Sequence, residues 1–166
     1  MKNILVVLVI LAAAGYLWKQ NHRPAQAPEA LANPVYAEAH VKMGAGGRDI
    51  EGVMLGKTVD QADCQKNIET LTRRVEEESP KFCPSCTVHV TSECKTELAP
   101  RYAMLFDNKP SHVAYIRFAQ GDPSEREYRL IYWGLTVQES ERLCGASSRF
   151  QQGRKGAVSC VHARTE

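Results

Sequence analysis

The feature that most constrains this chain is the apolar stretch of residues 4–18, which begins at Ile4, ends at Trp18 and is flanked by Lys2 and Lys19. Its roughly 15 uncharged residues are slightly fewer than the 17–25 of a spanning helix and fall within the range of a signal peptide. Either use of the segment exports the rest of the chain. The stretch therefore decides the compartment of the cysteines, and with it their chemistry.

Two uses of this stretch remain open. Ala12 and Ala14 have the small-x-small form that signal peptidase accepts. In favour of retention, the apolar run continues to Trp18 and Lys19, an aromatic–cation edge that membrane–water interfaces favour. Residues 20–34 are rich in Pro and Ala and predict an extended spacer, which is useful only if its front end is tethered. We expect a retained membrane anchor.

The chain then divides into an anchor (residues 1–19), a linker (20–34) and one exported domain (35–166). Its 21 Lys and Arg are interspersed with 19 Asp and Glu, for a net charge of +2, so nucleic acid is not an expected partner. An even number of cysteines, six, predicts disulfides in an exported domain. We expect a single-pass protein of the bacterial inner membrane whose C-terminal domain faces the periplasm.

The residue patterns predict an α+β domain: two long helices packed on one mostly antiparallel sheet and stapled by disulfides. Capping boxes, Thr58 with Gln61 and Thr136 with Glu139, open the two helices. Pro80 is expected to stop the first, and the second is expected to run to about residue 152. Alternating or β-rich runs predict strands, and one further run predicts a short helix: strands at 35–43, 50–55, 87–93, 112–119, 127–133 and 157–162, and a helix at 97–106.

The strands at 112–119 and 127–133 are joined by a Gly- and Pro-containing turn, which predicts an antiparallel hairpin at the middle of the sheet.

The rise of a helix and the rise of a strand together assign the cysteines. From Cys64 the first helix climbs about 21 Å, and the following strand returns about 23 Å by Cys94. By the same reasoning, the strand after the second helix brings Cys160 back level with Cys144. Disulfides need Cα atoms within about 7 Å, so we favour Cys64–Cys94 and Cys144–Cys160. The remaining pair is Cys83–Cys86.

Cys83-Pro-Ser-Cys86 is the one motif with possible chemistry, because a short-loop disulfide can take part in thiol–disulfide exchange. Redox cysteines usually lie at a helix N-terminus, whose positive dipole end stabilises the thiolate. Here the motif follows a helix, so a structural staple is favoured over redox catalysis. Zinc binding is disfavoured because Cys64 and Cys94 would lie about 20 Å away.

No other catalytic set, cofactor fingerprint or metal-ligand spacing is present, and we expect no cofactor. The aromatic residues Tyr128, Tyr132 and Trp133 are candidates for a recognition surface on the hairpin. The leading hypothesis is a membrane-tethered accessory or assembly domain that binds another envelope protein without catalysis. The rival hypothesis is a tethered thiol–disulfide oxidoreductase using Cys83 and Cys86.

Overall fold

The computed structural model describes residues 31, 33–107, 109, 111–122, 125–147 and 154–163. The expected anchor, residues 1–19, and nearly all of the linker lie outside this part of the chain. Within the described ranges, no helix is both long and apolar enough to cross a membrane.

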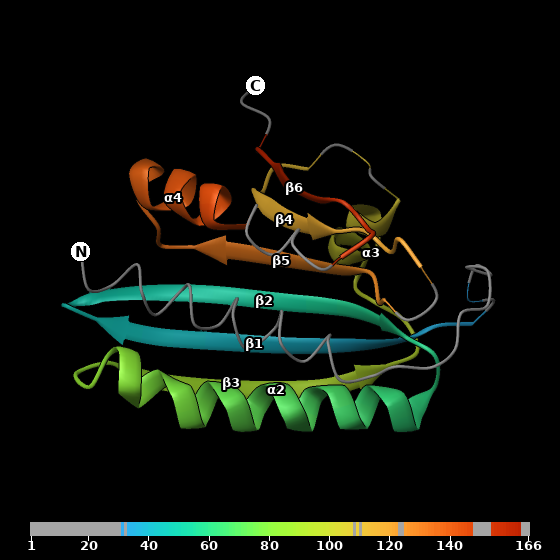
Figure 1. Ribbon diagram of the computed structural model, residues 1–166, viewed down its shortest axis with the longest axis horizontal. Coiled ribbons are helices and arrows are strands. Elements are labelled where there is room, and N and C mark those ends of the chain that lie inside the picture. The colour runs from blue at the N-terminus through green and yellow to red at the C-terminus, as the bar shows by residue number, and fades with distance from the viewer. Residues whose placement is uncertain are drawn as a thin grey trace.

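The described chain forms a six-stranded sheet with three helices, an α+β fold as expected. The sheet order is β3-β1-β2-β5-β4-β6, and every neighbouring pair is antiparallel (Figure 1). The elements in chain order are β1 (Val35–Ala45), β2 (Arg48–Thr58), α2 (Gln61–Phe82), β3 (Thr87–Lys95), α3 (Pro100–Phe106), β4 (Tyr115–Phe118), β5 (Tyr128–Trp133), α4 (Val137–Ser147) and β6 (Val158–Val161).

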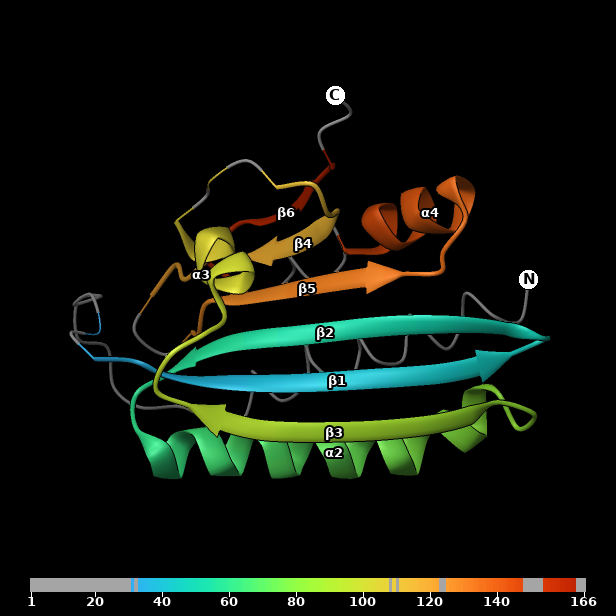
Figure 2. The ribbon, with the colours of Figure 1, turned by 180° about the vertical axis from the view of Figure 1, so that it is seen from behind.

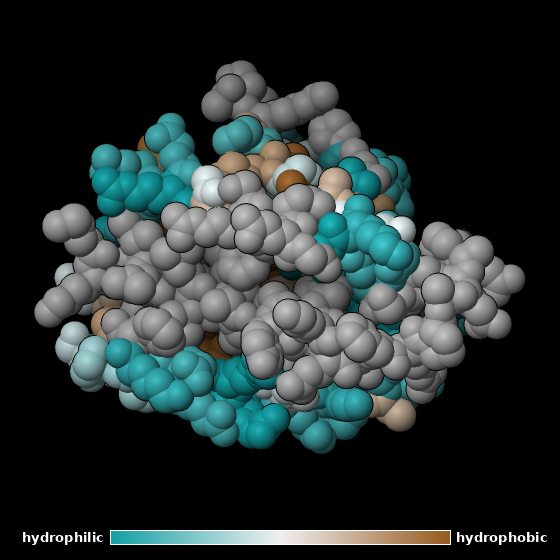
Figure 3. Space-filling view, in the orientation of Figure 1, coloured by the Kyte–Doolittle hydropathy of each residue, from teal (hydrophilic) through white to brown (hydrophobic). Residues whose placement is uncertain are grey.

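One face of the sheet packs against α2 and α4. Successive side chains of a strand point to opposite faces of the sheet, so β1 presents Ala39, Val41 and Met43 to this face. They form a core cluster with Leu71 of α2 and Leu143 of α4. The outward surfaces of these two helices are mostly hydrophilic (Figure 3). Both helices are therefore amphipathic covers of a single sheet face.

Among the described elements, the short helix α3 covers the other face, over part of its area (Figure 2). Leu105 and Phe106 of α3 pack on Leu55 of β2 and Ile131 of β5. The β1 and β3 positions on this side carry polar residues such as Lys42 and His89, which are exposed. An antiparallel sheet tolerates such an open half because it needs only one fully buried face.

The helices differ from the two long ones expected. α2 is long, with 22 residues, but α4 has 11 described residues and α3 has seven. The expected end of the second helix, near residue 152, lies outside the described ranges. α3 begins at Pro100 rather than at the expected residue 97, and proline fits the first helical turn because it lacks only an N–H that this turn leaves unbonded.

Both ends of α2 differ from those predicted from the sequence. The N-cap is Asp60, whose carboxylate accepts from the Asp63 amide at 2.8 Å. Thr58 instead ends β2, and its hydroxyl donates to the Val35 carbonyl at 2.7 Å. At the other end the helix continues through Pro80, because the Cys83 amide donates to the Ser79 carbonyl at 2.9 Å and closes the last turn.

The predicted hairpin forms, since β4 and β5 are antiparallel neighbours. It occupies the middle of the sheet in part, because β5 is one of the two central strands and pairs with β2, whereas β4 lies between β5 and the edge strand β6. The 11-residue strands β1 and β2 form a second, longer hairpin around Gly46 and Gly47. Both glycines have positive φ, 59° and 77°, as a two-residue hairpin turn requires. This longer hairpin contributes β2, the other central strand.

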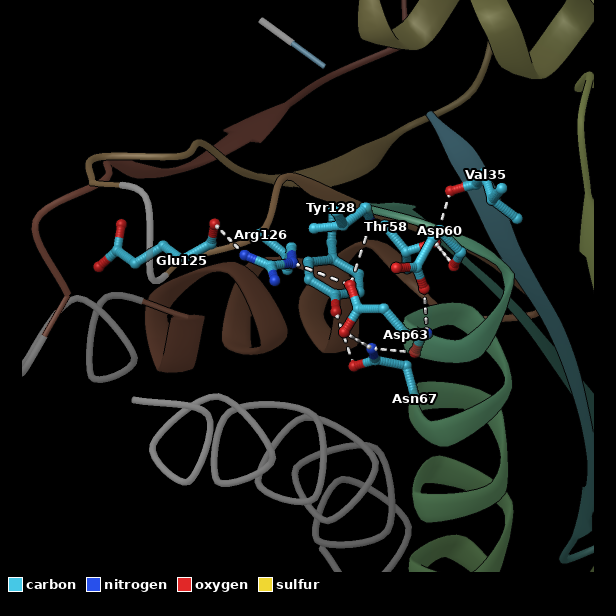
Figure 4. Close-up of polar contacts among 9 residues, drawn as sticks. Val35, Thr58, Asp60, Asp63, Asn67, Glu125, Arg126 and Tyr128 are labelled. Carbon is cyan, nitrogen blue, oxygen red and sulfur yellow. Dashed lines mark hydrogen bonds and ion pairs between the residues drawn. The ribbon is translucent and has the colours of Figure 1, made fainter. Parts of the chain in front are cut away.

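A polar cluster joins the start of α2 to the segment before β5 (Figure 4). The Asp63 carboxylate accepts from the Val59 amide at 3.1 Å and from Arg126 Nε at 3.2 Å. The Tyr128 hydroxyl donates to Asn67 Oδ1 at 3.3 Å. Because Asp63 and Arg126 are largely buried, this ion pair is screened less than a surface pair.

A second charged network lies beneath α3. Arg129 is fully buried, and its guanidinium donates to the carbonyls of Leu105 and Tyr128, both at 2.9 Å, and to the Glu127 carboxylate at 2.5 Å. Glu127 also accepts from Lys57 Nζ at 2.9 Å. Burial raises the pKa of Glu127, but the hydrogen bonds and charges of Lys57 and Arg129 outweigh this and lower it overall. Glu127 therefore stays ionised between two cations.

Candidate binding surface

All six cysteines are paired, as Cys64–Cys94, Cys83–Cys86 and Cys144–Cys160. These are the pairs that the helix-to-strand register favours. Cys64 and Cys94 fasten α2 to the edge strand β3, with their Cα atoms 6.0 Å apart. Cys144 and Cys160 fasten α4 to the other edge strand, β6, at 5.8 Å. Each outer strand is therefore covalently fixed to the helix that covers it.

The Cys83–Cys86 bond closes the turn between α2 and β3. Cys83 is the C-cap of α2 and is buried, and the Cys86 amide donates to its carbonyl at 3.0 Å. The nearby end of the helix dipole is negative, which opposes a thiolate at Cys83. Burial of Cys83 also restricts attack on its sulfur by an external thiol. The local geometry therefore favours a structural role for this disulfide over thiol exchange.

The three aromatic candidates do not share a surface. Tyr128 is buried, with its hydroxyl bonded to Asn67, and burial raises its pKa. Tyr132 is half-buried on the same face, and its hydroxyl lies 3.0 Å from Ser140 Oγ of α4. Trp133 points to the opposite face, because successive strand residues alternate, and is 36% exposed. Only Trp133 is available for contact with a partner.

Trp133 lies at one end of the sheet, where several loops meet (left in Figure 1). β3 starts beside the end of β1, since Thr87 pairs with Gly44, and β5 ends beside the start of β2. Val137, the first residue of α4, is 76% exposed, more than any other large apolar side chain described. We call six of the exposed residues at this end the distal surface: Gly46, Gly47, Pro84, Ser85, Trp133 and Val137.

The connection between Trp133 and Val137 is held rigidly. Gly134 has a φ of 78°, and a Cβ atom there would lie 2.2 Å from the Asp49 carbonyl oxygen, so only glycine fits. Arg48 donates to the Gly134 carbonyl at 2.7 Å and to the Glu139 carboxylate at 2.8 Å. The two exposed apolar side chains are thereby fixed relative to the β1–β2 turn.

Glu139 also completes the predicted capping box of α4. Its carboxylate accepts from the Thr136 amide at 2.8 Å, and the Glu139 amide donates to the Thr136 hydroxyl at 3.3 Å. The hydrogen bond from Arg48, followed by that from the Thr136 backbone, lowers the pKa of Glu139 to about 2. This carboxylate is ionised throughout the physiological pH range.

Replacing Glu139 with Gln should lower the free energy of unfolding by about 1 kcal/mol at pH 7, since the ion pair is partly exposed. Because the folded-state pKa is depressed, the wild-type carboxylate stabilises above about pH 4.3 and loses this contribution as the pH falls toward 2. Urea unfolding at pH 7 and pH 3 checks this. The stability difference between wild type and Glu139→Gln should shrink at pH 3, whereas the exposed Glu141→Gln control should match wild type at pH 7. An undiminished difference at pH 3 contradicts the prediction.

A small apolar pocket of about 30 Å³ lies under α4, beside Tyr132. It is far smaller than the roughly 300–1,000 Å³ of a small-molecule site. Among the residues that the structure describes, no group of three or more His, Cys, Asp or Glu side chains could hold a metal ion. The residues that line the apolar pocket come from β1, β2, β5 and α4: Val41, Met43, Ile50, Met54, Leu130 and Leu143.

Sequence reasoning did not single out Val137, which occupies the first turn of a capped helix and is exposed. A helix-start position directly after a glycine-containing turn is the signal that could have identified it. Sequence comparison adds no assignment. No protein-family model matches this chain, and neither a curated protein nor a solved structure shows significant similarity to it.

Proposed function

We propose that this chain is a membrane-tethered, exported domain that binds another envelope protein through the distal surface, without catalysis. The tether is residues 4–18, and residues 20–34 are the spacer. The compartment is the one in which the three disulfides would persist, the bacterial periplasm.

The observation that carries the proposal is the position of the distal surface relative to the start of the domain. The chain enters the sheet at Val35, and β1 runs its 11 residues, about 35 Å, to the opposite end. A domain held by its N-terminus would therefore present Trp133 and Val137 away from the membrane. Exposed aromatic and aliphatic side chains on a rigid frame are the usual anchors of a protein interface.

The test is chemical cross-linking in intact cells followed by purification of the full-length chain. We expect one partner to be recovered with wild type, and its yield to fall about fivefold or more when Trp133 and Val137 are both replaced by Ser. Val59→Ser is a matched control, because Val59 is 37% exposed, close to the 36% of Trp133, but lies at the opposite end of β2. Unfolding midpoints show that each variant folds.

Two outcomes would count against the proposal. Equal losses in the Val59→Ser and double-Ser variants would show that the distal surface has no special role. A reduction potential of the Cys83–Cys86 disulfide near or above about −200 mV would favour thiol exchange instead.

A further inference from the structure

Arg117 of β4 has a side-chain donor without a partner in the part of the chain that the structure describes. The residue is half-buried, and its Nε atom is shielded from solvent and bonds to none of the described residues. The nearby carboxylate, Glu127, is already shared between Lys57 and Arg129. An N–H donor that is shielded from water and has no partner costs free energy, so an acceptor at this position would be stabilising.

The sheet register places a second guanidinium beside it. Arg117 pairs with Arg129 across β4 and β5. The Lys57 amide donates to the Glu127 carbonyl, so the odd-numbered residues of β5 bond toward β2 and its even-numbered residues bond toward β4. Arg117 and Arg129 therefore form a non-hydrogen-bonded pair, the closer of the two cross-strand arrangements. Like charges directly opposite each other destabilise a sheet.

Only Arg129 is compensated, by Glu127 and two carbonyls. Burial lowers the pKa of Arg129, and the charge of Arg117 lowers it further. On the other side of Arg117, its pairing partner on β6 is Ser159, an exposed residue on the same face of the sheet. A hydroxyl donor thus borders the uncompensated guanidinium at the edge of the fold.

We propose that Arg117 and Ser159 form a binding site for a carboxylate group. A guanidinium presents a planar fork of donors that matches a carboxylate, and one monoanion balances the one uncompensated guanidinium. The ligand is an acidic side chain or a chain terminus of another molecule. This site is distinct from the distal surface, since it lies on the β4–β6 side of the sheet, and it does not depend on the proposed function.

The probe is acetate, compared with sodium chloride at the same ionic strength and pH 7, added to the full-length protein in detergent. Amide resonances of residues 117 and 159 should shift saturably with acetate. The Arg117→Gln variant should bind at least about tenfold more weakly, as expected for loss of a charge-assisted hydrogen bond. The control Arg101→Gln, which removes an exposed arginine from α3, should bind like wild type.

The same samples provide the outcomes that would overturn the site. If acetate and chloride shift the two resonances equally, the guanidinium is satisfied by water or by general screening. If inorganic phosphate binds and acetate does not, the carboxylate assignment is wrong. Unfolding midpoints distinguish these outcomes from misfolding. Arg117→Gln should unfold at or above the wild-type midpoint without acetate, because it removes the like-charge pair.

Discussion

Replacing Cys64 and Cys94 with Ala should lower the free energy of unfolding by about 3–4 kcal/mol. The disulfide closes a loop with a sequence separation of 30 residues. Opening such a loop increases the conformational entropy of the unfolded chain, and this lowers the free energy of the unfolded state by about that amount. Both the edge strand β3 and the N-terminal part of α2 lose their covalent link. Urea or guanidinium unfolding of the oxidised proteins, with full denaturation curves, measures the change.

The other disulfides provide a graded control. Cys144–Cys160 spans 16 residues and should contribute about 3 kcal/mol, whereas Cys83–Cys86 spans three and should contribute about 1–2 kcal/mol. The order of the three losses tests the explanation better than any single value. If removal of the shortest loop were the most destabilising, chain entropy would not be the reason these bonds stabilise the domain.

Arg129→Met should lower the free energy of unfolding by about 3–5 kcal/mol. The substitution leaves the buried carbonyl of Leu105 without its donor and removes one of the two cations that pair with Glu127. It also removes the guanidinium 4.7 Å from the centre of the Phe106 ring. Chemical denaturation at pH 7 measures the loss.

Two further variants separate the reasons for that loss. Lys57→Met removes the other cation from the same carboxylate but from a partly exposed position, and should cost about 1 kcal/mol or less. Adding Glu127→Gln to Arg129→Met should recover part of the stability, since it removes the buried charge that the first substitution leaves poorly compensated. A double variant less stable than Arg129→Met would argue against an electrostatic origin.

The sequence predicts best those features that depend on fixed geometry. The buried stripe of α2, which includes Ile68 and Val75, has helical spacing, and the cysteine pairs follow from the rises of helix and strand. The second capping box forms as its spacing indicates. The first predicted capping box, Thr58 with Gln61, does not form. Thr58 and Asp60 are both good N-cap residues, but Thr58 pairs with Val35 in the sheet, so Asp60 is the N-cap.

The candidate sites depend on contacts that are distant in sequence, and the sequence predicts them poorly. Trp133 follows Tyr132 directly, so alternation alone could have separated the two residues onto opposite faces. No local pattern marks Arg129 as buried, because α3, which covers it, starts almost thirty residues earlier. That Arg117 Nε bonds to none of the described residues likewise emerges only when β4, β5 and β6 are placed side by side.

The disulfides also determine how this domain can come apart. Cys64–Cys94 and Cys83–Cys86 lie within residues 64–94, and Cys144–Cys160 lies within residues 144–160. No disulfide therefore joins the two halves of the sheet, β3-β1-β2 and β5-β4-β6. They meet at the β2–β5 ladder. Reversible opening of the native state under oxidising conditions would therefore follow that seam, with each part keeping its own helix fastened, and hydrogen exchange in β2 and β5 would report a subglobal unit. A protein built this way can loosen at its centre while its edges stay closed.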